Sequence, residues 1–180
     1  MRLVRRILLL ALALVVAAAA GYTLVARSQL ERARDDVEAS WSALAEPLDA
    51  RYALLGAVTA AIGDTGGPAA ALVSDVDDAL ERWRSARRGN APVDAQVDAA
   101  NRLEGLGRRL AATVRASVRL SGRPEVVAAL DAYAGAPVPE QAAAYDAAAR
   151  RYADERSSSA RRLVAQVLGY EAVSAFDLAS

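Results

Sequence analysis

The stretch from Leu30 to Ile62 constrains the fold most, because its apolar residues recur with the period of an α-helix along its whole length. Such spacing places them on one helical face. At about 1.5 Å per residue the helix would be roughly 50 Å long, which is more than the width of a small globule. A face of that length must be covered by other long helices. The residues are Leu30, Val37, Trp41, Leu44, Leu48, Tyr52, Leu55, Val58 and Ile62.

The rest of the chain supplies such helices. Apolar residues at helical spacing predict them over residues 69–88, 93–120, 124–134 and 140–168. Turns rich in Gly and Pro separate these segments, and no segment alternates as a strand does. The expected fold is therefore all-α, an antiparallel bundle of long helices, four in number. Pro47 lies inside the first helix and predicts a kink that leaves the apolar face in phase.

The N-terminal part of the chain has the pattern of a membrane anchor. Residues 1–6 are short and basic, and residues 7–26 are 20 consecutive uncharged residues, mostly Leu, Val and Ala. A helix of that length spans about 30 Å, the thickness of a bilayer core. A cleaved secretory signal is the alternative, because small residues follow the most apolar part. The apolar run continues to Ala26, which favours a retained transmembrane helix.

The expected domain organisation follows from these segments. The helical bundle covers residues 27–168, and an apolar tail covers residues 169–180. If the helices alternate in direction, the tail returns to the end of the bundle nearest the membrane. We expect it to pack on the foot of the first helix or to lie in the lipid interface.

The numbers of Arg residues on the two sides of the span do not decide its orientation in the membrane. Arg residues precede and follow the span in equal number, and acidic residues count little under the positive-inside rule. The free amino terminus and the tight upstream Arg cluster favour an internal N-terminus. The expectation is a single-pass protein of the cell membrane with an extracytoplasmic body.

The composition excludes several classes of chemistry. The 22 basic and 22 acidic residues leave no net charge, so the sequence lacks the excess of positive charge typical of nucleic-acid-binding proteins. The chain has no His, Cys or Lys. Triads with His or Cys, imidazole and thiolate metal sites and Schiff-base lysines are therefore excluded. We expect no catalytic residue, cofactor, metal ion or small-molecule substrate.

Two groups of carboxylates have the chemistry of possible sites. Asp64-Thr65-Gly66 matches the tripeptide of aspartic proteases, but that site requires an Asp at the end of a strand, whereas this one closes a helix. A capped loop is the better interpretation. Asp75, Asp77 and Asp78 have the chemistry of hard-cation ligands. On a helix only Asp75 and Asp78 share a side, so a solvated first turn is preferred.

The large aromatic residues are predicted to lie in the core. Trp41 and Trp83 are in phase with the apolar residues of their helices, and Tyr145 and Tyr152 are one heptad apart. We expect all four rings to be buried and the two Tyr hydroxyls to reach polar partners. A network from the two Tyr hydroxyls to Asp49 and Arg51 is a further hypothesis. The Arg pairs are interpreted as solvated faces, or alternatively as contacts with anionic lipid or an acidic partner; they are Arg108-Arg109, Arg150-Arg151 and Arg161-Arg162.

Together the first and last helices resemble the LemA family. The first helix matches the family pattern of Arg, Val, Trp and spaced aliphatic residues. Near the C-terminus, two Tyr-X pairs seven residues apart and a Gly-aromatic pair resemble the family's ending. Of the family's twin basic pair only one Arg remains, and both Asn that follow the Tyr residues are replaced. The matching positions are Arg34, Val37, Trp41, Leu44, Leu48, Arg51, Leu54, Leu55, Val58, Leu80-Glu81-Arg82, Ala86-Arg87, Tyr145-Asp146, Tyr152-Ala153, Leu163-Val164-Ala165, Gly169-Tyr170 and Ala175-Phe176.

The resemblance implies a membrane-anchored helical bundle, a divergent LemA family protein of the bacterial membrane with no settled biochemical role. Three functional hypotheses remain. The first is a non-catalytic interaction or scaffolding module that engages another membrane or envelope protein. The second is a lipid-surface structural protein that acts through its Arg-rich faces. The third is a carboxylate hydrolase built on Asp64 or on core carboxylates, which Asp64→Ala would inactivate.

Overall fold

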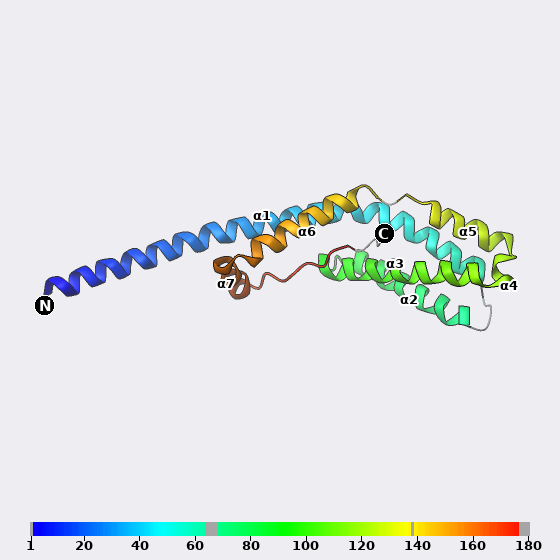
Figure 1. Cartoon of the computed structure of the whole chain (residues 1–180), viewed down its shortest axis with the longest axis horizontal. Coiled ribbons are helices and arrows are strands. Elements are labelled where there is room, and N and C mark those ends of the chain that lie inside the picture. The colour runs from blue at the N-terminus through cyan, green and yellow to red at the C-terminus, as the bar shows by residue number, and fades with distance from the viewer. Residues whose placement is uncertain (1, 64–67, 138, 177–180) are drawn as a thin grey trace.

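The computed structural model describes the backbone of residues 2–63, 68–137 and 139–176; side chains are described from residue 21 onward, apart from Pro68, Ser159 and Ala160, together with that of Leu14. Within these ranges the chain is helical and contains no strand, which confirms the all-α prediction (Figure 1). The helices are α1 Arg2–Ile62, α2 Pro68–Arg88, α3 Val93–Ala116, α4 Val118–Ser121, α5 Pro124–Gly135, α6 Gln141–Ser157 and α7 Ser159–Leu168.

Helix α1 is the axis of the molecule. It runs for 61 residues and passes through Pro47 without interruption. Its N-terminal part extends beyond the other helices, and its C-terminal part lies in the bundle (Figure 1). Residues 21–25 are exposed, whereas Ala26 is only 1 % exposed, so the bundle begins to cover α1 at Ala26. All nine predicted face residues, from Leu30 to Ile62, are buried.

The other helices cover α1 from two sides. Helices α5 and α6 follow one another along one side, α5 on the distal part and α6 nearer the N-terminus (Figure 1). Helices α2 and α3 form an antiparallel pair that also contacts α1. The predicted returning arm of the bundle therefore consists of α5 and α6 in series.

The predicted helix over 140–168 is wrong as a single element, because it breaks at Ser158. The backbone of Ser158 is extended, with φ −62° and ψ 133°. The hydroxyls of Ser157 and Ser158 donate to the carbonyls of Asp154 and Glu155, at 2.9 and 3.5 Å. Consecutive serines compete in this way with the helical hydrogen bonds. Helix α7 therefore leaves the direction of α6.

The predicted helix over 93–120 also ends early. Ser117 is extended, and its hydroxyl accepts a hydrogen bond from the Leu120 amide at 3.3 Å, which starts the short helix α4. The side chain thus caps a new helix in place of the next turn of α3.

The tail turns back toward the middle of the bundle after Gly169. Gly169 has φ 72°, a left-handed conformation that suits glycine at the end of α7. Phe176 is then buried and packs edge-on against Trp41, with ring centroids 6.0 Å apart. The expectation that the tail ends at the foot of α1 or in the lipid interface is wrong for Phe176, because the chain reverses after α7. Residues 177–180 of the predicted tail lie outside the described residues.

Within the part of the chain that the structure describes, no helix is long and apolar enough to cross a membrane. Most of the span predicted over 7–26 lies outside the residues whose side chains are described.

Candidate functional site

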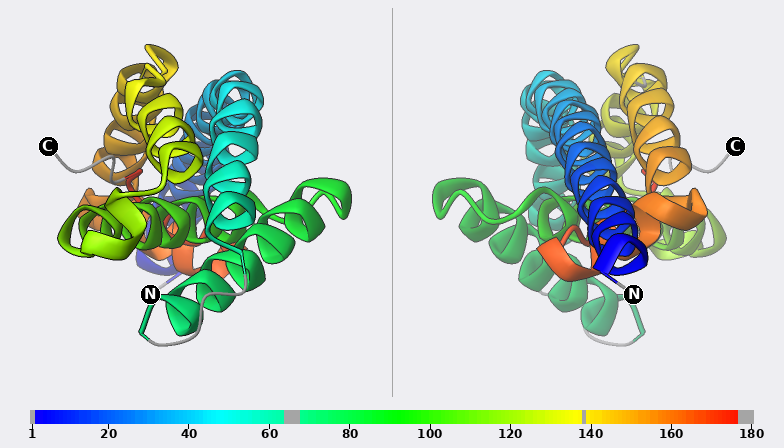
Figure 2. Two further views of the ribbon diagram at one scale, coloured as in Figure 1. Left: turned by 90° about the vertical axis from the view of Figure 1, so that its right-hand side faces the viewer. Right: turned by 90° about the vertical axis from the view of Figure 1, so that its left-hand side faces the viewer.

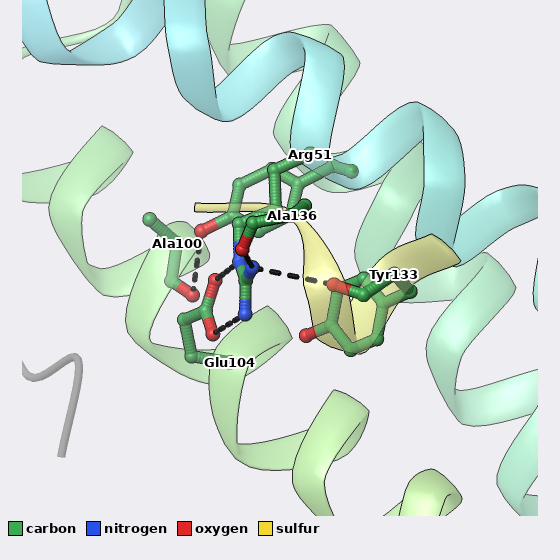
Figure 3. Close-up of polar contacts among 6 residues, drawn as sticks. Arg51, Ala100, Glu104, Tyr133 and Ala136 are labelled. Atoms are coloured by element: carbon green, nitrogen blue, oxygen red, sulfur yellow. Dashed lines mark hydrogen bonds and ion pairs between the residues drawn. The ribbon is translucent and has the colours of Figure 1, made fainter. Parts of the chain in front are cut away.

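The most deeply buried ion pair among the described residues joins α1 to α3. Arg51 of α1 and Glu104 of α3 retain side-chain exposures of only 12 and 3 %. The Arg51 Nε atom lies 2.9 Å from Glu104 Oε1, and Nη2 lies 3.3 Å from Oε2 (Figure 3). This two-pronged contact is the strong geometry for guanidinium and carboxylate groups.

The third guanidinium nitrogen, Nη1, contacts the C-terminal end of α5. Its Nη1 atom donates to the carbonyls of Ala136 and Tyr133, at 3.1 and 3.5 Å. The Tyr133 ring lies 4.6 Å from the guanidinium carbon (Figure 3). Burial alone would lower the pKa of Arg51, but the hydrogen bond and charge of Glu104 outweigh burial and raise it. Arg51 stays charged and links α1, α3 and α5, so we call Arg51, Glu104 and Tyr133 the clasp.

The clasp contains one buried phenol, that of Tyr133, and a second, that of Tyr52, lies beside it. The Tyr52 hydroxyl donates to the Ala100 carbonyl at 3.3 Å, while the buried Tyr133 hydroxyl has no hydrogen-bond partner among the described residues. Burial raises the pKa of Tyr133 to about 12, with the charge of Glu104 as the second cause. The same two causes raise the pKa of Tyr52. Both phenols are therefore neutral at physiological pH.

A second polar network lies closer to the N-terminal end of the bundle. The indole of Trp83 donates to Asp49 at 2.7 Å, and that of Trp41 donates to Gln96 at 3.0 Å. Arg87 bridges the two acceptors, with contacts of 3.2 Å to Asp49 and 3.3 Å to Gln96. Both indoles are buried, as predicted, and each has a hydrogen-bond acceptor.

A third set of contacts holds the tail against α6. The hydroxyls of Tyr145 and Tyr152 donate to the carbonyls of Ser174 and Glu171, at 2.8 and 3.0 Å. Both rings are buried as predicted. The hypothesis that these hydroxyls reach Asp49 and Arg51 is wrong, because the reversed tail supplies their acceptors.

The predicted carboxylate sites have different outcomes. Asp64-Thr65-Gly66 lies outside the described residues. Asp77 accepts a hydrogen bond from Thr59 at 2.8 Å and so ties α2 to α1. Within the described part of the chain, no group of three or more acidic, His or Cys residues could hold a metal ion. The open groove beside Asp77, of about 710 Å³, is lined mainly by small residues of α1 and α2.

The predicted Arg pairs are mostly exposed. Arg108, Arg109, Arg150 and Arg151 face solvent. Arg161 is partly covered and pairs with Glu155.

Sequence reasoning missed the roles of Gln96 and Glu104. Both are in phase with the apolar face of α3, and they are only 5 and 3 % exposed. A polar residue on a predicted core face is the signal that could have identified them, because a buried polar group requires a partner.

Gly107 gives a direct test of the packing in the clasp. A Cβ atom at Gly107 would lie 2.2 Å from the Tyr133 hydroxyl oxygen. We expect Gly107→Ala to lower the free energy of unfolding by about 1–3 kcal/mol through overpacking. Adding Tyr133→Phe, which also removes an unpartnered hydroxyl, should recover part of this loss. Urea unfolding followed by circular dichroism measures both.

Gly105 is the matched control on the same helix. A Cβ atom at Gly105 would meet no neighbouring atom within 4 Å, so Gly105→Ala should stabilise the helix by up to about 1 kcal/mol. Equal effects of the two Gly→Ala changes would contradict the packing described for Tyr133.

The raised phenol pKa values predict a loss of stability at high pH. The pKa of Tyr133 is about 12 in the folded protein, against an ordinary value of 10.0. Above pH 10 the unfolded chain releases a proton that the folded chain retains, so unfolding is favoured progressively until the pH passes about 12. Tyr133→Phe should therefore lose less stability between these two pH values than the unmodified chain. Urea unfolding of both proteins at pH 10 and at pH 12 measures the difference.

Comparisons with known proteins add no family to this description. No family model matches the sequence, and no curated protein or solved structure matches the chain.

Proposed function

We propose that this chain is a single-pass, LemA-like membrane protein that holds a non-catalytic helical bundle at the bacterial membrane as an interaction or scaffolding module. The observation that carries the proposal is the continuity of α1. One helix, Arg2–Ile62, contains both the apolar segment 7–26 and the central face of the bundle. Because one helix contains both parts, the anchor would fix the position of the bundle relative to the membrane.

The surface of α1 supports the assignment of the anchor. Leu14, Leu24 and Val25 expose 74, 69 and 56 % of their surfaces, and Tyr22 exposes 46 %. Exposed aliphatic residues in the N-terminal part of a helix that leaves the bundle are suited to lipid, and a Tyr near the end of the span suits the headgroup region. The burial of α1 begins at Ala26, where the apolar segment ends.

The use of the polar groups supports a module without catalysis. Glu104 is bound to Arg51, and Asp49 is bound to Trp83 and Arg87. These contacts join helices to each other and leave the buried Glu104 carboxylate inaccessible to a substrate. The proposed partner is therefore a membrane or envelope protein, with lipid contacted through 7–26, and neither nucleic acid nor a small-molecule substrate.

A charge in the span tests the anchor. Arg at the centre of a membrane helix costs about 2.5–3.5 kcal/mol, so Leu14→Arg should lower the ratio of inserted to released protein roughly 50-fold or more. Extraction of membranes with alkaline carbonate separates inserted from peripheral protein. Val118→Arg, at an exposed position of α4, is the control and should remain in the membrane pellet.

Complete release of the unmodified chain by carbonate would overturn the anchor. Retention of Leu14→Arg at the level of the unmodified chain would also count against it, because an exposed Arg at position 14 would then be tolerated where the span is proposed.

A further inference from the structure

We propose that α7 is a second membrane contact, a helix that lies in the headgroup region of the bilayer with Leu163 and Val167 turned toward the acyl chains. The inference rests on the proposed anchor, since it takes the position of the membrane from the segment 7–26. It adds a site that orients the bundle on the lipid surface.

The first argument is the exposed apolar face of α7. Leu163 and Val167 lie one helical turn apart and expose 66 and 83 % of their surfaces, and Leu168 exposes 47 %. On the side toward the bundle, Ala165 is only 3 % exposed. The helix therefore packs through Ala165 and the partly buried Val164, and it leaves Leu163, Val167 and Leu168 largely uncovered by the described protein.

The second argument is the position of α7 beside the part of α1 that directly follows the proposed span. Helix α7 contacts α1, and it lies at the end of the bundle from which the N-terminal part of α1 extends (Figure 1). Tyr170, which follows α7 after Gly169, interacts with Glu31 and Arg27 of α1. These residues follow Ala26, where the apolar segment ends. The level of α7 is therefore the level at which the proposed span leaves the membrane.

The third argument is the direction of α7. It lies across the axis of α1: Figure 1 shows α1 from the side and α7 nearly end-on, and the views along α1 in Figure 2 show α7 extending sideways. If α1 crosses the bilayer, a helix perpendicular to it lies in the plane of the membrane. That is the orientation of interfacial amphipathic helices, whose apolar faces enter about 5–10 Å into the boundary between headgroups and acyl chains.

The charges fit a lipid surface better than an apolar protein partner. Arg162 is exposed on α7, and Arg32 is exposed on the neighbouring part of α1, where Arg27 is also exposed but pairs with Glu31. Exposed Arg residues beside an inserted apolar face can contact lipid phosphates, and they favour anionic headgroups. We therefore assign the uncovered face to the bilayer.

The absence of Cys from the chain allows a clean test with single-cysteine variants. The full-length protein is reconstituted into vesicles of phosphatidylcholine and phosphatidylglycerol, with an environment-sensitive fluorophore at Val167→Cys. Quenching is measured with nitroxide lipids that carry the spin label near the headgroup or deep in the acyl chain, and with aqueous iodide. Leu14→Cys reports the anchor, and Val118→Cys, 89 % exposed on α4 at the far end of the bundle, reports water.

We expect the Val167 label to be quenched more strongly by the shallow nitroxide than by the deep one, and only weakly by iodide. The Leu14 label should be quenched by the deep nitroxide, and the Val118 label by iodide alone. A Val167 label quenched by iodide as strongly as Val118, with Leu14 still quenched by lipid, would overturn the role of α7 and leave the anchor intact. Loss of lipid quenching at Leu14 would overturn the anchor itself.

A Val167 label that is protected from iodide but not quenched by any nitroxide lipid would also overturn the proposal. The face would then be covered by protein, from a second copy or another chain. Circular dichroism of each labelled variant checks that the helical content is unchanged, which is expected because each substituted side chain is exposed.

Discussion

Replacing Glu104 by Leu is expected to lower the free energy of unfolding by about 3–5 kcal/mol, because the change leaves the Arg51 charge buried without its partner. Arg51 has only 12 % of its side chain exposed, so water cannot fully replace the carboxylate. Urea unfolding of the full chain in detergent micelles, followed by the helical circular dichroism signal, measures the loss.

Two variants make this result specific. Combining Glu104→Leu with Arg51→Met removes both charges and should restore much of the stability, because apolar replacements of buried ion pairs are often neutral or stabilising. Glu81→Leu breaks an exposed contact with Arg88, where the side chains are 63 and 67 % exposed, and should cost no more than about 1 kcal/mol. A similar small cost for Glu104→Leu would show that Arg51 does not depend on Glu104.

Trp41→Ala is the second change with a large expected effect, about 3–5 kcal/mol, the usual cost of truncating a buried aromatic residue. The Trp41 ring lies 5.2 Å from Tyr145, 6.0 Å from Phe176 and 6.2 Å from Trp83, measured between centroids. Its indole also satisfies Gln96. One side chain of α1 therefore joins contacts to α2, α3, α6 and the tail.

Comparing the stability losses of three variants separates the contribution of Trp41 to the helical core from its contact with the tail. Phe176→Ala removes one of these ring contacts and should chiefly expose the tail to proteases, with a smaller loss of global stability. Val118→Ala, at an exposed position, should change stability by no more than about 0.5 kcal/mol. A Trp41→Ala protein as stable as Val118→Ala would contradict the central position of the ring.

The main axis of the fold could be predicted from the sequence because helical period and burial coincide along α1. Every residue of the predicted face is buried, and so are both Trp residues. The starts and ends of α2 and α5 lie within one or two residues of those predicted, because Gly and Pro mark their boundaries. These are local signals that act within a few turns of helix.

The polar contacts and the path of the tail could not be predicted, because they depend on which helices become neighbours. The partner of Arg51 lies 53 residues away in the sequence, and the acceptor of the Tyr145 hydroxyl lies 29 residues away. The break at Ser158 is local, but a run of serines is compatible with a helix until its hydroxyls bind the carbonyls of the preceding turn. The exposed face of α7 is visible only once that break is known.

The most direct test of a membrane-anchored interaction module is proximity labelling in intact cells with a membrane-impermeant substrate. The labelling enzyme is fused to the C-terminus of the full chain, and the control carries the same enzyme directly after residues 1–26. We predict a set of envelope proteins that is labelled outside the membrane by the full chain and not by the control. Identical sets from both proteins would contradict the proposal, because the bundle would then contribute no interaction beyond that of its anchor.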